Sequence, residues 1–201
     1  ERVMVIADEI YEHINYVGAH ASMAQFPDIK DRVVIVNGVS KAYAMTGWRI
    51  GFIAAPEWVV KGCNKLQGQY TSGPCSVSQK AAEAAYTGSQ ECVEVMRRAF
   101  ERRRDLIVRL AREIPGLEVN NPHGAFYLFP KCSNFFGKRD GDRVISNSTD
   151  LAMYLLEVGH VATVGGDAFG APGYFRMSYA TSEANITEAM RRIADTLARL
   201  K

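Results

Sequence analysis

The sequence lacks the long apolar run and the charge imbalance that mark several classes of protein. No stretch of the 201 residues approaches the roughly 18 apolar residues of a membrane span, so no membrane partner is expected. The 24 Lys and Arg residues nearly balance the 22 Asp and Glu residues, which leaves a net charge of +2. So small a charge gives no electrostatic reason to expect nucleic acid as a partner. The first residues also lack the basic and apolar regions of a signal peptide.

Cysteine is scarce. The four cysteines have no C-x-x-C spacing, and none lies near a histidine at the spacing of metal ligands. So few cysteines make no disulfide framework, which predicts reduced thiols in a cytoplasmic protein without a metal site. They are Cys63, Cys75, Cys92 and Cys132. The remaining composition, with 47% hydrophobic and 23% charged residues, is that of a globular protein.

Three short apolar runs lie in the first quarter of the chain, at residues 3–7, 33–36 and 50–55. They are near-continuous, which is typical of strands buried on both faces in a helix-covered α/β sheet. The chain enters the first run almost at once; a processed terminus accounts for that start, and so does a fragment without its upstream half. Asp8 and Asn37 directly follow the first two runs, where open α/β sheets collect ligands.

Helical patterns dominate the middle of the chain. Apolar residues from 93 to 114 recur at spacings of three, four and seven, which predicts one long amphipathic helix ended by Pro115-Gly116. Its other face interleaves arginines with acidic residues, which favours a solvated face over a nucleic-acid surface. Strands are expected at 125–129, 161–164 and 175–179, with helices at 150–158 and after Ser182. The sequence thus predicts a sheet domain over residues 1–90 and, over 91–201, the long helix with a small α+β domain.

Lys41 and Arg49 follow the second predicted strand closely. A lysine held there, partly desolvated and near other cations, favours the neutral and nucleophilic amine. Arg49 suits an anionic group, which its guanidinium binds through two parallel hydrogen bonds. Taken singly, each residue fits an ordinary solvated loop better than a site.

Two readings stay open for the acidic segment after the first strand. Asp8 either caps a helix that follows or pairs with a cationic ring nitrogen, and Tyr11, one helical turn further on, reaches the same ligand. A metal site made of Asp8, Glu9, Glu12 and His13 is less favoured. Adjacent acids point in different directions, and no second histidine is near.

Arg176 stands in a mostly apolar predicted strand. An arginine with such neighbours needs a carboxylate partner, which is either internal or a substrate. The segment before it carries Gly165, Gly166, Gly170 and Gly173 around an aromatic residue. Because it lacks the G-x-G-x-x-G spacing between a strand and a helix, it predicts a turn-rich loop and no nucleotide site.

Five segments in this order resemble the aspartate aminotransferase family, the class I aminotransferases of fold type I, which use pyridoxal phosphate. They are Ala-Asp-Glu-Ile-Tyr-Glu at 7–12, Ser-Lys at 40–41, Met-Thr-Gly-Trp-Arg-Ile-Gly at 45–51, Gly-Ala-Phe-Tyr at 124–127 and Phe-Arg-Met-Ser-Tyr-Ala at 175–180. The resemblance covers nearly the whole chain but only the C-terminal half of a family member. It implies that residues 1–90 are the C-terminal part of the cofactor-binding large domain, built on a mostly parallel sheet, and that 91–201 form the small domain.

The resemblance also implies a role for each matched residue. Lys41 resembles the lysine that forms the Schiff base with the cofactor and moves the α-proton. Asp8 resembles the acid that keeps the pyridine nitrogen protonated, and Tyr11 the donor to the ring's 3-oxygen. Arg49 resembles a phosphate ligand, and Arg176 the arginine that binds the substrate's α-carboxylate.

Gly38 departs from this pattern, because many members have a serine phosphate ligand three residues before the lysine. Ser40 or the backbone is then expected to make that contact. The family's first half supplies further phosphate ligands and the aromatic ring that stacks on the cofactor. The resemblance therefore implies that this chain alone is inactive and binds pyridoxal phosphate weakly.

The implied activity of the whole protein is transamination, with aspartate as the expected amino acid and 2-oxoglutarate as the expected 2-oxo acid. The implied assembly is a homodimer. A carbon–sulfur β-lyase on the same fold would use the same residues, so it remains an alternative. A non-catalytic truncated module is the other alternative.

Overall fold

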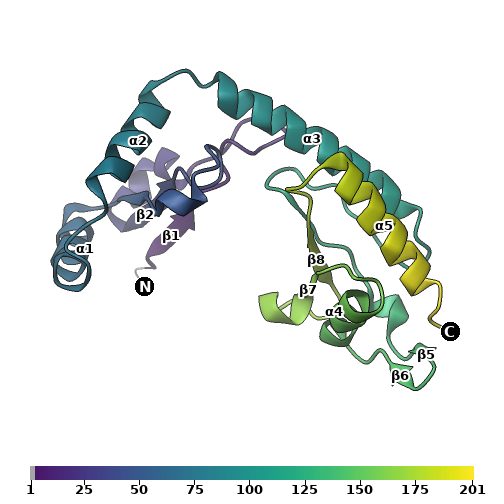
Figure 1. Cartoon of the computed structure of the whole chain (residues 1–201). Coiled ribbons are helices and arrows are strands. Elements are labelled where there is room, and N and C mark those ends of the chain that lie inside the picture. The colour runs from purple at the N-terminus through teal and green to yellow at the C-terminus, as the bar shows by residue number, and fades with distance from the viewer. Residues whose placement is uncertain (1–2) are drawn as a thin grey trace. The chain divides into compact units, whose positions relative to one another are not determined.

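The computed structural model describes residues 3–201, which form two compact units (Figure 1). The first unit runs up to Arg98 and the second from Ala99 to the C-terminus. The division falls inside helix α3 (Glu91–Arg112), whose bounds match the predicted long helix. Assignment of residues 1–90 and 91–201 to a large and a small domain stays a prediction.

The first unit contains a three-stranded sheet in the order β1 (Val5–Asp8), β2 (Val33–Gly38) and β3 (Gly51–Ala54). The three apolar runs are thus confirmed as strands. β1 and β2 are parallel, whereas β2 and β3 are antiparallel, so this sheet is mixed and not mostly parallel. Residues 39–50 hold only a short 3-10 turn (Thr46–Trp48) and no crossover helix of the kind a parallel neighbour needs.

Burial differs among the three strands. β2 is buried along nearly its whole length, as predicted, while β1 and β3 are largely exposed in the described residues. Ile6 of β1 and Phe52 of β3 are 73% and 48% exposed. The expectation of burial on both faces therefore holds for the central strand alone, because each edge strand has a described neighbour on one side only.

Two helices complete the first unit. Helix α1 (Glu57–Tyr70) begins after Pro56 and ends before Ser72, whose φ of 62° is left-handed. Helix α2 (Ser76–Thr87) follows, and two 3-10 turns, Met23–Gln25 and Pro27–Arg32, join β1 to β2. No residue of α1 is buried among the described residues.

The second unit packs helices around small antiparallel sheets. Strands β4 (Tyr127–Leu128), β8 (Phe175–Ser178) and β7 (Val164–Gly165) pair in that order. β5 (Arg139–Asp140) and β6 (Arg143–Val144) form a second, two-stranded antiparallel sheet. Helix α4 (Ser148–Glu157) and helix α5 (Glu183–Leu197) complete the unit.

The core of the second unit follows from its amphipathic helices. Ser182 caps α5 as predicted, because its side chain accepts a hydrogen bond from the Asn185 N–H at 3.1 Å. The helix then buries one apolar stripe, made of Ile186, Met190, Ile193 and Leu197, and the Tyr154 hydroxyl of α4 donates to its Thr196 carbonyl at 3.2 Å. The largest side chains with almost no exposure in this core are Leu128, Ile145, Leu151, Tyr154, Leu155, Phe175, Tyr179 and Ile193.

The described residues contain no helix both long and apolar enough to span a membrane. All four cysteines are free, and only Cys132 is buried. Burial raises the pKa of the Cys132 thiol to about 12.

Candidate active site

Strand register gathers four of the predicted site residues at one edge of the first sheet. Asp8 ends β1 and pairs with Val36 of the parallel β2. Ser40 and Lys41 follow the end of β2, which lies at the same edge. Arg49 precedes β3 by two residues, and Gly51 of β3 pairs with Gly38 of β2. This edge therefore brings together a carboxylate, an amine and a guanidinium.

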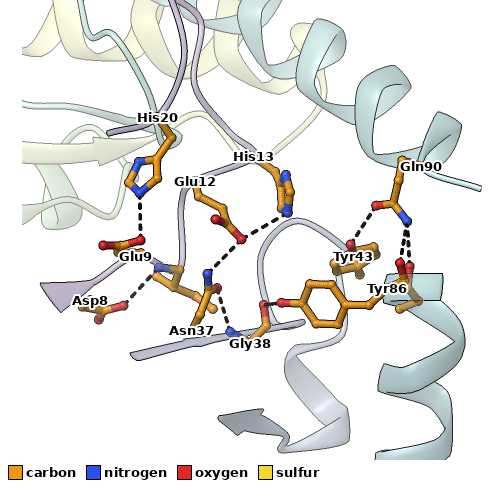
Figure 2. Close-up of polar contacts among 12 residues, drawn as sticks. Asp8, Glu9, Glu12, His13, His20, Asn37, Gly38, Tyr43, Tyr86 and Gln90 are labelled. Atoms are coloured by element: carbon orange, nitrogen blue, oxygen red, sulfur yellow. Dashed lines mark hydrogen bonds and ion pairs between the residues drawn. The ribbon is translucent and has the colours of Figure 1, made fainter. Parts of the chain in front are cut away.

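Asp8 presents an exposed carboxylate at this edge (Figure 2). Its Oδ1 accepts a hydrogen bond from the Ile10 N–H at 3.2 Å, so Asp8 caps a turn. The expectation of a helix after the first strand is wrong, because residues 9–22 contain none. Within residues 3–201 no cation pairs with this carboxylate, which leaves its other oxygen available to a ligand. Tyr11 lies partly buried in the turn that follows.

The turn after β2 that carries Lys41 is followed by two left-handed residues. Ala44 and Arg49 have φ values of 54° and 52°, a region that costs non-glycine residues free energy and that is enriched at functional sites. The Arg49 guanidinium donates to the Thr46 carbonyl at 2.9 Å. No carboxylate of the described residues pairs with it, so it retains donors for an anion.

Arg49 also lines a cavity of about 520 Å³ over β2, β3 and α1. Asn37 and Phe52 of the sheet and Cys63, Asn64 and Gln67 of α1 line it as well. Arg49 gives this cavity a guanidinium, which suits an anionic ligand.

Gly38 has a steric explanation. A Cβ added there would lie 2.9 Å from the Gly51 Cα and 3.0 Å from the Ile50 carbonyl oxygen. Both contacts are with backbone, which cannot move aside as a side chain can. The close approach of β2 and β3 therefore excludes the serine that many family members have at this position, and the partly buried Ser40 stays the predicted alternative.

Two tyrosines that the sequence analysis did not single out support the Lys41 turn (Figure 2). Tyr86 of α2 donates to the Gly38 carbonyl at 3.2 Å, and Tyr43 donates to the Gln90 Oε1 at 2.8 Å. The two rings meet edge to face at 5.2 Å, and Phe52 packs on Tyr86 at 5.7 Å. Burial raises the pKa of Tyr86 to about 12 and raises that of Tyr43, so both stay neutral donors.

The side chain of Asn37 connects strand β2 to the loop after β1. Its side-chain amide donates to the Glu12 Oε1 at 2.8 Å, and its side-chain oxygen accepts from the Gly38 N–H at 2.7 Å. Because Asn37 is buried within β2, the structure gives this candidate a positioning contact with the loop after β1.

A second cluster holds that loop. The buried Glu9 carboxylate accepts from the His20 Nε2 at 3.0 Å, the Ser22 Oγ at 3.1 Å and the Met23 N–H at 2.9 Å. Burial alone would raise the pKa of Glu9, but the hydrogen bonds from His20 and its neighbours outweigh it and hold the pKa below its ordinary value. Ligand atoms of Glu9, Glu12 and His20 lie within 4.8 Å of one another, so a second histidine is present after all. Since these donors already satisfy Glu9, we assign the cluster to fixing residues 9–23.

Arg176 lies on β8 and belongs to the second unit, whereas the five other predicted residues belong to the first. Its guanidinium carbon lies 4.5 Å from the ring centroid of Tyr127 and 4.5 Å from that of Phe169. Within residues 3–201 no carboxylate pairs with it. Of the two partners considered for Arg176, the internal one is therefore not found.

Comparison with known proteins places this architecture in a family. The sequence family described as aminotransferase class I and II matches residues 1–193, so the chain belongs to it, as the resemblance predicted. This is a family of pyridoxal-phosphate-dependent enzymes.

The individual relatives that match this chain include aspartate aminotransferases. The bifunctional aspartate aminotransferase and glutamate/aspartate-prephenate aminotransferase of Petunia hybrida is 48% identical over 206 residues, covering 100% of this chain and 43% of the relative. The aspartate aminotransferase of Rhizobium meliloti strain 1021 is 47% identical, covering 98% and 49%. The chain spans about half the length of the curated relatives it matches.

Solved structures give the same result. A crystal structure of the Rhizobium meliloti aspartate aminotransferase has a TM-score of 0.95 at 46% identity, covering 99% of this chain and 50% of that one. The Thermus thermophilus aspartate aminotransferase solved with maleate has a TM-score of 0.85 at 38% identity, covering 96% and 48%. The α/β prediction is confirmed at the level of half an aminotransferase fold.

Proposed function

We propose that this chain supplies the lysine-bearing half of a pyridoxal-phosphate-dependent aminotransferase that moves an amino group between aspartate and a 2-oxo acid. One observation supports the proposal above others. The Asp8 carboxylate and the Arg49 guanidinium, neither paired with an opposite charge in the described chain, lie at the same sheet edge as Lys41. This donor set complements a ligand with a cationic ring nitrogen and a phosphate.

The residues would hold the cofactor as follows. Asp8 would pair with the pyridine nitrogen, Tyr11 would donate to the 3-oxygen, and Arg49 with Ser40 would bind the phosphate. Pyridoxal phosphate, when bound, supplies an electron sink. Lys41 would carry the cofactor, and its Nζ would move the proton at the substrate α-carbon. The tyrosines beneath the Lys41 turn would fix the position of this amine.

Substrate choice rests on Arg176 and on the relatives. We assign Arg176 the α-carboxylate that all amino acids share, because its guanidinium has no carboxylate partner in the described chain. The names of the Petunia hybrida and Rickettsia prowazekii relatives combine aspartate with prephenate. We therefore propose aspartate as the amino donor, 2-oxoglutarate as the first acceptor to test and prephenate as the second.

The exposed apolar surface of the first unit supports assembly. Large apolar residues of α1 and its surroundings stand exposed, among them Trp58, Leu66, Tyr70 and Val77. Such a surface is usually covered in the functional protein, and we propose a homodimer of the whole protein. The exposed thiols support a reducing compartment such as the cytoplasm.

A chimaeric protein tests the proposal. The Rhizobium meliloti aspartate aminotransferase supplies the half of the family sequence that this chain does not match, and this chain replaces the other half. We expect the chimaera to convert aspartate and 2-oxoglutarate, and the Lys41→Ala chimaera to be inactive. The 201-residue chain alone should bind the cofactor weakly, because each missing hydrogen bond to a charged group is worth about 1.5–3 kcal/mol. A folded chimaera without transamination, or equal turnover in the Lys41→Ala form, would contradict the proposal.

A further inference from the structure

The Arg176 guanidinium has aromatic neighbours where arginines of apolar strands usually have carboxylates. We propose that Tyr127 and Phe169 are positioning residues: they hold the Arg176 side chain in one orientation and leave its uncovered N–H edge as the approach for a carboxylate. The inference rests on the proposed function, since it deepens the role given to Arg176.

Strand pairing places the first ring. Tyr127 of β4 is opposite Ser178 of the antiparallel β8, and Arg176 is two residues from Ser178. Residues in this diagonal relation share one face of the sheet, and long and aromatic side chains reach across the distance. The 4.5 Å from the guanidinium carbon to the Tyr127 ring centroid is within the range of cation–π attraction.

A tight turn places the second ring. Phe169 ends the 3-10 turn Gly166–Phe169. Gly166 has no room for a side chain, because a Cβ would lie 2.2 Å from the Ala171 carbonyl oxygen, and Gly170 is left-handed with a φ of 67°. The glycines singled out in the sequence thus form the turn that carries Phe169 to Arg176.

The same turn is anchored to helix α4. Asp167 accepts hydrogen bonds from the Ser148 Oγ at 2.5 Å and the Thr149 Oγ1 at 3.3 Å. The bond from Ser148 is the main cause that lowers the pKa of Asp167 below its ordinary value. Phe169 also meets the Phe129 ring edge to face at 6.0 Å. Phe169 is therefore held in place although it is 47% exposed.

Two ring faces restrict how an anion reaches Arg176. The face of an aromatic ring carries negative charge density, so it attracts the guanidinium and repels an incoming anion. The uncovered edge of the guanidinium offers parallel N–H donors, the geometry that matches a carboxylate. Fixing the side chain beforehand also reduces the rotamer entropy lost on binding.

Arginine NMR on the 201-residue chain tests the proposal, with maleate as the carboxylate probe. We expect ring currents to move the Arg176 Nε–Hε and Cδ–Hδ signals upfield. Phe169→Leu and Tyr127→Leu should each move them back downfield and weaken maleate binding about 3- to 10-fold, the loss of one cation–π contact. Because Phe169 is half exposed, its variant should fold. Tyr174→Leu is the matched control, because it removes a ring of the same cluster that stacks on Phe129, while the cation–π contacts of Arg176 in the described residues are with Tyr127 and Phe169.

The outcomes separate this inference from the proposed function. Loss of the maleate response in Arg176→Gln, together with unchanged signals and affinity in both leucine variants, would overturn the aromatic positioning and leave the carboxylate role intact. A maleate response that survives Arg176→Gln would overturn the carboxylate role itself. Tyr174→Leu with an effect as large as Phe169→Leu would also overturn the positioning, because general packing would then explain both.

Discussion

Replacing Gly38 by alanine tests the steric account of the site most sharply. The new Cβ would lie 2.9 Å from the Gly51 Cα and 3.0 Å from the Ile50 carbonyl oxygen, so β2 and β3 must separate or shift. Overpacking of this kind costs about 1–3 kcal/mol of unfolding free energy. With a urea slope of about 1–2 kcal/mol per molar for a unit of this size, the midpoint of unfolding should fall by roughly 1 M.

Tryptophan fluorescence makes the assay specific. Both tryptophans of the chain, Trp48 and Trp58, lie in the first unit, so their emission reports on the unit that contains Gly38. Gly47→Ala is the matched control, because nothing lies within 4 Å of a Cβ added there. We expect the control to keep or slightly raise the midpoint. A Gly38→Ala midpoint equal to that of the control would refute the steric argument, and with it the reason given for the missing serine.

Three further predictions concern stability and reactivity. Tyr86→Phe removes the donor to the Gly38 carbonyl and should cost about 0.5–1.5 kcal/mol in the same fluorescence assay; no loss would show that water replaces the bond. The pKa of Glu9 lies below its ordinary 4.5, so its contribution is present at neutral pH and is lost as the pH falls below about 4.5. Urea midpoints from pH 6 to 3 should therefore fall more steeply for the native chain than for Glu9→Gln, and parallel curves would exclude this linkage. A thiol reagent should modify three cysteines in the folded chain and Cys132 only after unfolding, because Cys132 is buried with a pKa of about 12; rapid modification of all four would contradict its burial.

Local patterns in the sequence predicted the elements whose periodicity is strong. Helix α3 and the capped helix α5 follow directly from apolar spacings and from Ser182. Strand β2 follows from its continuous apolar run, since it is the strand buried along its length. The antiparallel direction of β3 was missed, because apolar composition does not encode which way a strand runs.

The site was predicted by motif resemblance more than by chemistry. Lys41 and Arg176, taken singly, looked like ordinary loop and strand residues. Contacts between distant segments could not be predicted: Tyr86 meets Gly38 across 48 positions, and Phe169 meets Arg176 through a turn that looked like a plain loop. Such contacts depend on strand pairing and tight turns, which local spacing does not specify.

The position of the covalently bound cofactor tests the central claim most directly. The chimaera is loaded with pyridoxal phosphate, reduced with borohydride, digested and analysed by peptide mass spectrometry. We expect a cofactor-modified peptide at Lys41 and, in Lys41→Ala, no stoichiometric modification elsewhere. Lys61→Ala, which changes an exposed lysine of α1, should give the same modified peptide as the chimaera without a substitution. Stoichiometric modification of another lysine, or transamination that persists in Lys41→Ala, would contradict it.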